Sequence, residues 1–207
     1  MNQVLKDHRM ESIVNSAVGY LNRHDLSSLT IRKLAAESGF SVGHIHHHFS
    51  SVEELKARAL KKMTRSVLEI LNNLTYTDHR HLLERFLLID QSHYPNFVAV
   101  LREFRVQANL SLLIREAFND SMRLVHRDIC KIIVSGIRRG ELVSYDCQTM
   151  SKKAWKIIAF IQGLDSLMGI QLIEDNDLTA LDFIRDMLDA EVPRKDFKIV
   201  PRPDRLK

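Results

Sequence analysis

The stretch that decides the fold is Thr30-Ile-Arg-Lys-Leu-Ala-Ala-Glu-Ser-Gly-Phe-Ser-Val-Gly-His-Ile-His-His-His-Phe49. Its apolar residues are spaced so that they can line one small core, as the faces of short amphipathic helices do; they are Leu34, Ala35, Phe40, Val42, Ile45 and Phe49. Gly39 interrupts the pattern, and glycine accepts without steric cost the positive φ of a tight turn. The stretch therefore predicts two short helices that are hinged at Gly39 and share a core.

This arrangement is that of a helix-turn-helix, in which the second helix enters the major groove of DNA. Thr30 is placed to cap the first of the two helices, and the second covers about residues 41–47. Ser51 and Glu54 have the spacing of a capping box that begins a longer helix. Because a pair of helices joined by glycine is common, the flanking residues have to support the assignment.

The flanking residues resemble the TetR/AcrR family of one-component transcriptional regulators. Its members carry a pattern like T-h-x-x-I-A-x-x-A-G-V-S-x-G-x-h-Y-x-Y-F-x-x-K-E-x-L, where h is apolar. The chain matches this pattern at Thr30, Ile31, Leu34, Ala35, Gly39, Phe40, Ser41, Gly43, Ile45, Phe49, Glu54 and Leu55, after a first helix that supplies Ile13, Val14, Ala17, Val18 and Leu21. The two tyrosines of the family are here His46 and His48, and its lysine is Val52. The resemblance implies an all-α, TetR-like fold.

The family's DNA-facing positions and the polar outer face of the motif give the predicted DNA contacts. These are Thr30, Arg32, Ser41, Val42, Gly43, His44, His46, His47, His48 and Lys56. Lys56 is included because it follows the reading helix closely, in the first turn of the next helix, where a cation can meet a phosphate.

The histidine run also allows a metal-binding alternative. His44 and His48 are four residues apart and share a helix face, as zinc ligands do. No carboxylate or cysteine nearby completes a coordination shell. We predict no metal and no cofactor, and a metal-sensing regulator stays as the alternative.

Composition sets wider limits. The formal net charge is +4, but the segment 193–207 holds six Lys/Arg and two Asp/Glu, which leaves 24 of each sign in residues 1–192. Overall charge is therefore poor evidence for DNA binding. The two cysteines have no metal or disulfide spacing, and neither a signal segment nor a run of eighteen apolar residues is present, so we expect a soluble cytoplasmic protein. No phosphate-binding glycine loop, nucleophile elbow or dinucleotide fingerprint supports an enzyme.

The resemblance and the helical pattern give the predicted organisation. We expect a DNA-binding domain over 6–66, a ligand-binding and dimerisation domain over 67–192, and a basic, proline-containing tail over 193–207. The first helix is predicted over about 7–24, and a long one from Val52 to Leu74 could join the two domains. Later helices are predicted over about 78–93, 96–108, 110–138, 151–173 and 178–189, with breaks at Pro95, Gly140 and residues 174–177.

Polar residues that interrupt apolar helix faces in the carboxy-terminal part are the candidate ligand contacts, together with the only tryptophan. They are Arg102, Arg105, Arg123, His126, Trp155, Gln162 and Asp165. Such groups need partners when they are buried, and a ligand can be one.

The last two helices are the predicted dimer interface, because residues 154–172 are more apolar than one layer of neighbours can cover. Family members dimerise there through a four-helix bundle. The predicted contacts are Ile157, Ile161, Leu164, Met168, Leu172, Leu178, Leu181, Ile184 and Leu188. The run Ile161-Gln-Gly-Leu-Asp165 also resembles the choline-responsive, BetI-like branch of the family.

These observations predict a homodimeric regulator, a repressor, that binds an inverted repeat in double-stranded DNA and is released by a small molecule. No membrane partner is expected. The alternatives are the metal sensor and a small helical enzyme or interaction module.

Overall fold

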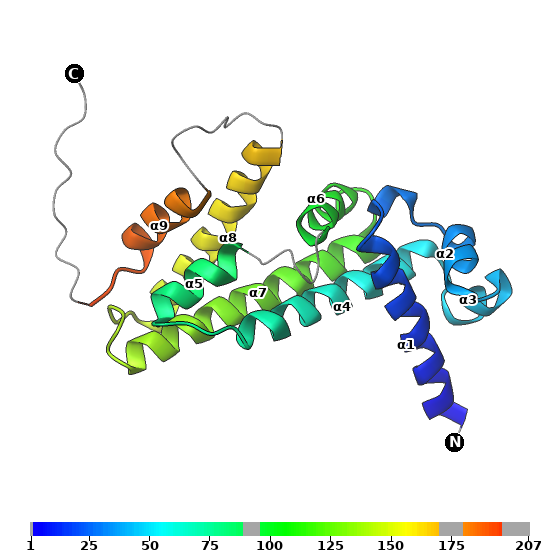
Figure 1. Cartoon of the computed structure of the whole chain (residues 1–207), viewed down its shortest axis with the longest axis horizontal. Coiled ribbons are helices and arrows are strands. Elements are labelled where there is room, and N and C mark those ends of the chain that lie inside the picture. Colours follow the sequence, from blue (N-terminus) through cyan, green and yellow to red (C-terminus); the bar gives the residue numbers. More distant parts are fainter. Residues whose placement is uncertain (1, 89–95, 170–179, 196–207) are drawn as a thin grey trace. The chain divides into compact units, whose positions relative to one another are not determined.

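The computed structural model describes residues 2–88, 96–169 and 180–195, with side chains from Lys6 onward, and it confirms the all-α prediction (Figure 1). The helices are α1 (Asn2–Leu21), a short 3-10 turn η1 (Leu26–Ser28), α2 (Ile31–Ser38), α3 (Val42–His48), α4 (Val52–Asn72), α5 (His79–Leu88), α6 (Phe97–Gln107), α7 (Leu112–Arg138), α8 (Cys147–Gly169) and α9 (Ala180–Glu191). None of these helices is long and apolar enough to cross a membrane, within the described residues.

Most predicted helix bounds agree with the structure to within a turn. The first helix begins at Asn2 and ends at Leu21, so it starts earlier than predicted. α8 begins at Cys147 because Asp146 caps it, with its carboxylate accepting from the backbone N–H groups of Gln148 at 2.9 Å and Thr149 at 3.0 Å. The predicted breaks at Pro95 and at residues 174–177, and the tail from residue 196, lie outside the described residues.

The chain packs as two compact units. The first comprises residues 1–74 and 89–127, where α1 packs against α4 and α2 packs against both α1 and α3. The start of α6 is attached to the end of α1, because Asn96 Nδ2 donates to the carbonyls of Leu21 and His24 at 3.0 and 3.1 Å. The functional division that we predict at residue 66 differs from this division by packing, and it stays a prediction.

The core of the first unit contains three of the six apolar residues that the opening stretch places in it. Leu34, Ile45 and Phe49 are buried. Ala35 and Phe40 are only half-buried and Val42 is 38% exposed, so these three differ from the prediction. Phe40 and Val42 lie at the turn and the first residue of α3, a seven-residue helix that can present only one short face to a core.

The second unit comprises residues 75–88 and 128–207, where α9 packs against α5 and α8. Leu142 and His79 pack tightly against Gly136 of α7, where an added Cβ would lie 2.6 Å from Leu142 Cδ1 and 2.9 Å from His79 Cβ. Glycine is therefore needed at that position for space. His79 is buried beside it, with Nδ1 2.6 Å from Glu141 Oε2 and Nε2 2.7 Å from Ser135 Oγ.

Candidate nucleic-acid interface

The turn between α2 and α3 has the geometry that the sequence predicts. Thr30 is extended, and its Oγ1 accepts a hydrogen bond from Lys33 N at 3.2 Å, which caps α2. Gly39 ends α2 with φ 75° and ψ 1°, in the left-handed region that favours glycine. Ser41 Oγ then accepts from His44 N at 3.1 Å and caps α3. Three local signals thus set the start, the hinge and the restart of the motif.

The outer face of α3 carries the predicted DNA contacts. Ile45 is fully buried and anchors the helix, whereas His46 and His47 are exposed. His44 and His48 are half-buried, and their ring centroids lie 5.1 Å apart. The other predicted contacts on α2 and α3 are exposed as well: Thr30, Arg32, Ser41, Val42 and Gly43. The fold therefore leaves nine of the ten predicted residues exposed or partly exposed on one motif.

His48 lies in a positive environment. Burial holds the pKa of His48 below its ordinary value, and the charges of His44, His47, Lys6 and Arg9 lower it further. Its Nδ1 is buried and has no hydrogen-bond partner among the described residues. A phosphate would relieve this arrangement, because an anion favours the protonated ring.

Lys6 and Arg9, two residues of this positive environment, were not predicted from the sequence. Both are exposed on α1. Their spacing of three places them on one helix face, in line with Ile13 and one to two turns before it, and this basic pair was the signal available in the sequence. They extend the basic surface from α3 onto α1.

Lys56 is the exception among the predicted contacts. Its side chain is only 8% exposed and belongs to a buried run with Leu55 and Ala57. Burial lowers the pKa of Lys56, and the nearby Glu53 and Glu103 partly oppose that shift. The prediction relied on distance along the chain, but the phase of α4 turns this lysine inward.

We expect Lys56→Met to keep operator affinity within about twofold, with an unchanged salt dependence, because methionine keeps the packing of the stem and removes only a buried charge. The matched variant is Arg32→Met, at an exposed predicted contact, which should reduce the slope of log affinity against log salt by about 0.9 if it loses one phosphate. Fluorescence titrations across a salt series measure both slopes. Equal losses in the two variants would restore Lys56 as a contact.

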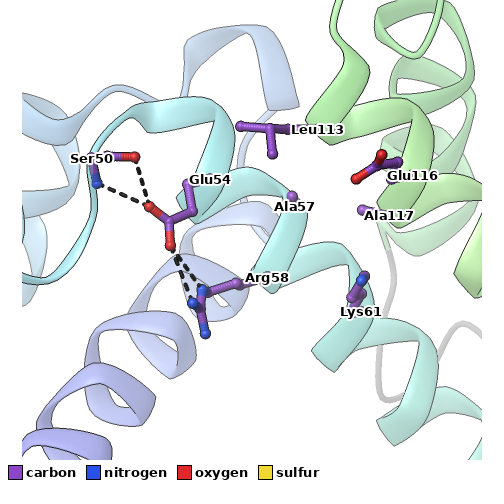
Figure 2. Close-up of a pocket in the computed structure, with 8 residues that line it drawn as sticks. All are labelled: Ser50, Glu54, Ala57, Arg58, Lys61, Leu113, Glu116 and Ala117. Carbon is purple, nitrogen blue, oxygen red and sulfur yellow. Dashed lines mark hydrogen bonds and ion pairs between the residues drawn. The ribbon is translucent and has the colours of Figure 1, made fainter.

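The end of the reading helix is fixed to α4 by a carboxylate clasp, which we define as Ser50, Glu54 and Arg58 (Figure 2). Glu54 Oε2 accepts from Ser50 N at 3.0 Å and from Ser50 Oγ at 2.9 Å, and Oε1 accepts from Arg58 Nε at 3.2 Å and Nη2 at 3.1 Å. The hydrogen bond from the Ser50 backbone is the largest cause that lowers the pKa of Glu54. Arg58 also lies over the Phe49 ring, 5.9 Å from its centroid.

One of the two hydrogen bonds of the predicted capping box is present. Ser51 Oγ accepts from Glu54 N at 3.1 Å and caps α4, but Glu54 turns its carboxylate to Ser50 instead of to the Ser51 backbone. The clasp therefore ties Ser50, the residue after the C-cap of α3, to the first two turns of α4.

The histidine cluster shows no metal-binding geometry. Among the described residues, no group of three or more His, Cys, Asp or Glu side chains could hold a metal ion. His48 meets His44 and His47 edge to face, at interplanar angles of 65° and 83°.

The predicted ligand contacts are divided between the two units. Arg102 and Arg105 lie on α6, and Arg123 and His126 lie on the part of α7 in the first unit. The other three, Trp155, Gln162 and Asp165, lie on α8 in the second unit. Trp155 is 43% exposed, and Arg123 is exposed and 3.4 Å from Asp120. Their joint role in a pocket stays a prediction.

The predicted dimer contacts fall into two groups. Ile157, Leu164, Ile184 and Leu188 are already buried within the chain, because the apolar stripes of α8 and α9 cover each other. These four are not available as an outer surface. Met168 is 44% exposed, Ile161 and Leu181 are half-buried, and Leu172 and Leu178 lie outside the described residues.

Comparison with known proteins agrees with this geometry. Residues 13–59 match the family model described as bacterial regulatory proteins, tetR family. No curated protein matches the chain. Among solved structures, a TetR transcription regulator from Haloarcula marismortui superposes with a TM-score of 0.69 at 21% identity, over 90% of this chain and 99% of that one.

Two further regulators show the same fold. One from Rhodococcus sp. RHA1 has a TM-score of 0.67 at 18% identity, over 89% of this chain and 97% of its own. Another, from Saccharomonospora viridis in complex with choline, has a TM-score of 0.65 at 22% identity, over 90% and 98%.

A capped helix-turn-helix with an exposed polar reading face, at the head of an all-α chain, defines a DNA-binding transcriptional regulator. Its amino-terminal residues 13–59 match the DNA-binding model of the tetR family of bacterial regulatory proteins, and the whole chain has the fold of solved TetR regulators. Members of this family are DNA-binding regulators and not enzymes.

Proposed function

We propose that this regulator is a repressor that binds an inverted-repeat operator as a homodimer and leaves it when a small molecule binds. The observation that carries the proposal is the exposure of His46 and His47 on a helix whose two ends are fixed, by the Ser41 cap and by the clasp. A rigid helix with free polar side chains is what reading base edges requires.

The operator symmetry follows from dimerisation. Two copies related by a two-fold axis present their reading helices to successive major grooves, so the half-sites form an inverted repeat one helical turn apart. In one conformation of the dimer the two DNA-binding domains do not match successive major grooves. A ligand that binds this conformation more tightly shifts the population away from the DNA-bound conformation. The seven side chains predicted as ligand contacts remain candidates for that role.

A binding selection from random duplexes, followed by gel shifts on DNA upstream of the protein's own gene, tests this function. We expect enrichment of an inverted repeat, bound at least about 1,000-fold more tightly than random DNA. Metal addition should leave the shift unchanged; a dependence on metal would favour the metal-sensing alternative. Uniform weak binding to every sequence would leave only an interaction module.

We expect Met168→Glu combined with Leu181→Asp to give monomers, because charges placed in an apolar interface have no partner and cost about 3–5 kcal/mol, or more than about 100-fold in the dimer dissociation constant. Both side chains retain exposure in the single chain, so the fold itself should persist.

The matched control is Leu88→Asp, an apolar residue of α5 that is 42% exposed but lies outside the predicted interface. Sedimentation velocity should show monomers for the double variant and dimers for the control. Dimers in both would place the interface on another surface.

A further inference from the structure

A cavity of about 450 Å³ lies between the amino-terminal parts of α4 and α7, wholly within the first unit (Figure 2). Its lining residues are Ser50, Glu54, Ala57, Arg58, Lys61, Leu113, Glu116 and Ala117. The volume is within the range of about 300–1,000 Å³ that is typical of small-molecule sites. None of the seven predicted ligand contacts lines it.

The charges of this cavity are paired except at one residue. Glu54 is bound by Arg58 and Ser50, and Lys61 Nζ lies 2.6 Å from Asp120 Oδ2. Glu116 is exposed, and its carboxylate makes no hydrogen bond or ion pair with any residue that the structure describes. Figure 2 shows this carboxylate on the side of α7 that is nearer α4. The unpaired charge of the site is therefore the negative charge of Glu116.

The remaining wall is apolar. Ala57 of α4 and Ala117 of α7 are buried, and Leu113 is 46% exposed at the edge of the cavity. An aliphatic group placed there would cover Leu113 and remove apolar surface from water, which is favourable.

From this geometry we propose that the cavity is an effector site for a small organic cation with an aliphatic body. The ammonium pairs with Glu116, and the aliphatic part packs against Ala57, Leu113 and Ala117. An anion of the same shape would face the carboxylates of Glu116 and Glu54 instead, with both basic residues of the lining already engaged.

The site is connected to the reading helix by the clasp, which forms its opposite wall. Ser50 follows Phe49, the residue that caps α3, and Arg58 lies over the Phe49 ring. A ligand that separates the amino-terminal parts of α4 and α7 therefore moves the end of α3 through Glu54. This regulation rests on the proposed function as a DNA-binding regulator, and it needs no residue of the second unit.

The test uses the full-length protein and n-hexylammonium, with hexanoate and hexanol as probes of equal length but different charge. Alanine methyl groups labelled with ¹³C report on the site, because Ala57 and Ala117 lie in its wall. We expect saturable shifts of these two resonances with hexylammonium only, and a loss of operator affinity of about tenfold at saturation.

Two variants locate the site. Glu116→Gln should weaken hexylammonium binding at least tenfold and abolish its effect on DNA, while DNA binding without ligand is unchanged. Glu69→Gln is the matched control, because Glu69 is an exposed acid of α4 that lines a different cavity, against α1. Leu113→Ser provides a second test of the apolar wall at a position that is not buried.

The outcomes are distinct. Equal binding of the three probes, or unchanged binding in Glu116→Gln, overturns the cation site. Hexylammonium binding without any change in operator affinity overturns the coupling through the clasp. If the protein binds no operator even without ligand, the proposed function fails, and the methyl shifts still decide whether the site exists.

Discussion

The Arg80→Ala variant should lose about 3 kcal/mol or more of unfolding free energy, since it removes a large buried side chain together with its ion pair to Asp189. Arg80 is 1% exposed, and its Nη2 donates to Asp189 Oδ1 at 2.6 Å and to the Arg185 carbonyl at 2.7 Å. Its Nη1 lies 3.9 Å from Glu84 Oε1, and Glu84 is itself only 10% exposed. Alanine removes the charge that offsets these oxygens and leaves a void in the packing of α5 against α9.

Urea denaturation at a fixed protein concentration measures the loss, because dimerisation makes stability depend on concentration. Arg85→Ala is the matched control on the same helix: Arg85 is half-buried and donates to the Thr75 carbonyl at 3.3 Å. That change should cost about 1 kcal/mol or less. A loss at Arg80 no larger than the loss at Arg85 would show that the network around Asp189 does not stabilise the second unit.

The motif was predictable because its signals are local. A hydroxyl at Thr30 or Ser41 caps a helix by bonding to an N–H three residues on, and Gly39 provides a conformation that few other residues adopt. Each signal is complete within one turn of chain. The register of the apolar residues then places Ile45 inside and His46 outside, as the structure confirms.

Contacts distant in sequence were not predictable in this way. Arg80 and Asp189 are 109 positions apart, and His79 and Glu141 are 62 apart, so no spacing rule connects them. The prediction for Lys56 was wrong for a different reason. The basic residues of α4 lie on both faces of the helix, and only packing against other helices such as α1 decides which face is buried. The same limit applies to α8 and α9. Their apolar faces predict that they are buried, but not whether the same chain or a second copy buries them.

Changing His46 and His47 together to Ala should weaken operator binding by about 2–6 kcal/mol, if each contributes one good contact of about 1–3 kcal/mol. The fold should persist, because both side chains are exposed and Ile45 alone anchors the middle of α3. Anisotropy titrations measure the affinity, and circular dichroism checks the helices. The control is His81→Ala, since His81 is half-buried on α5 and its ring bonds to Thr77 of the second unit. Unchanged affinity in the double variant would remove α3 as the reading helix.

Operator affinity should also rise as pH falls. The pKa of His48 in the free protein sets the pH below which affinity stops rising. In the free protein, burial, the neighbouring histidines and the charges of Lys6 and Arg9 hold the pKa of His48 below 6.5. A phosphate at the reading face raises that pKa in the complex, so protons are taken up between the lower free value and the higher bound one. Affinity therefore increases through this window and levels off only below the free value, where the ring is charged in both states.

The stability of the free protein should change with pH in the opposite direction to operator affinity. Because the unfolded chain binds the His48 proton more readily than the folded chain does, the stability of the free protein should decrease as pH falls below about 6.5. Operator titrations and urea curves at about pH 7.5 and about pH 5.5, on either side of the ordinary histidine value, measure both trends. His48→Gln should flatten each of them, and changing His44, His46, His47 and His48 together to Gln should remove the pH dependence of DNA binding. If the wild type and the quadruple variant respond to pH alike, these histidines do not exchange protons with the phosphate backbone.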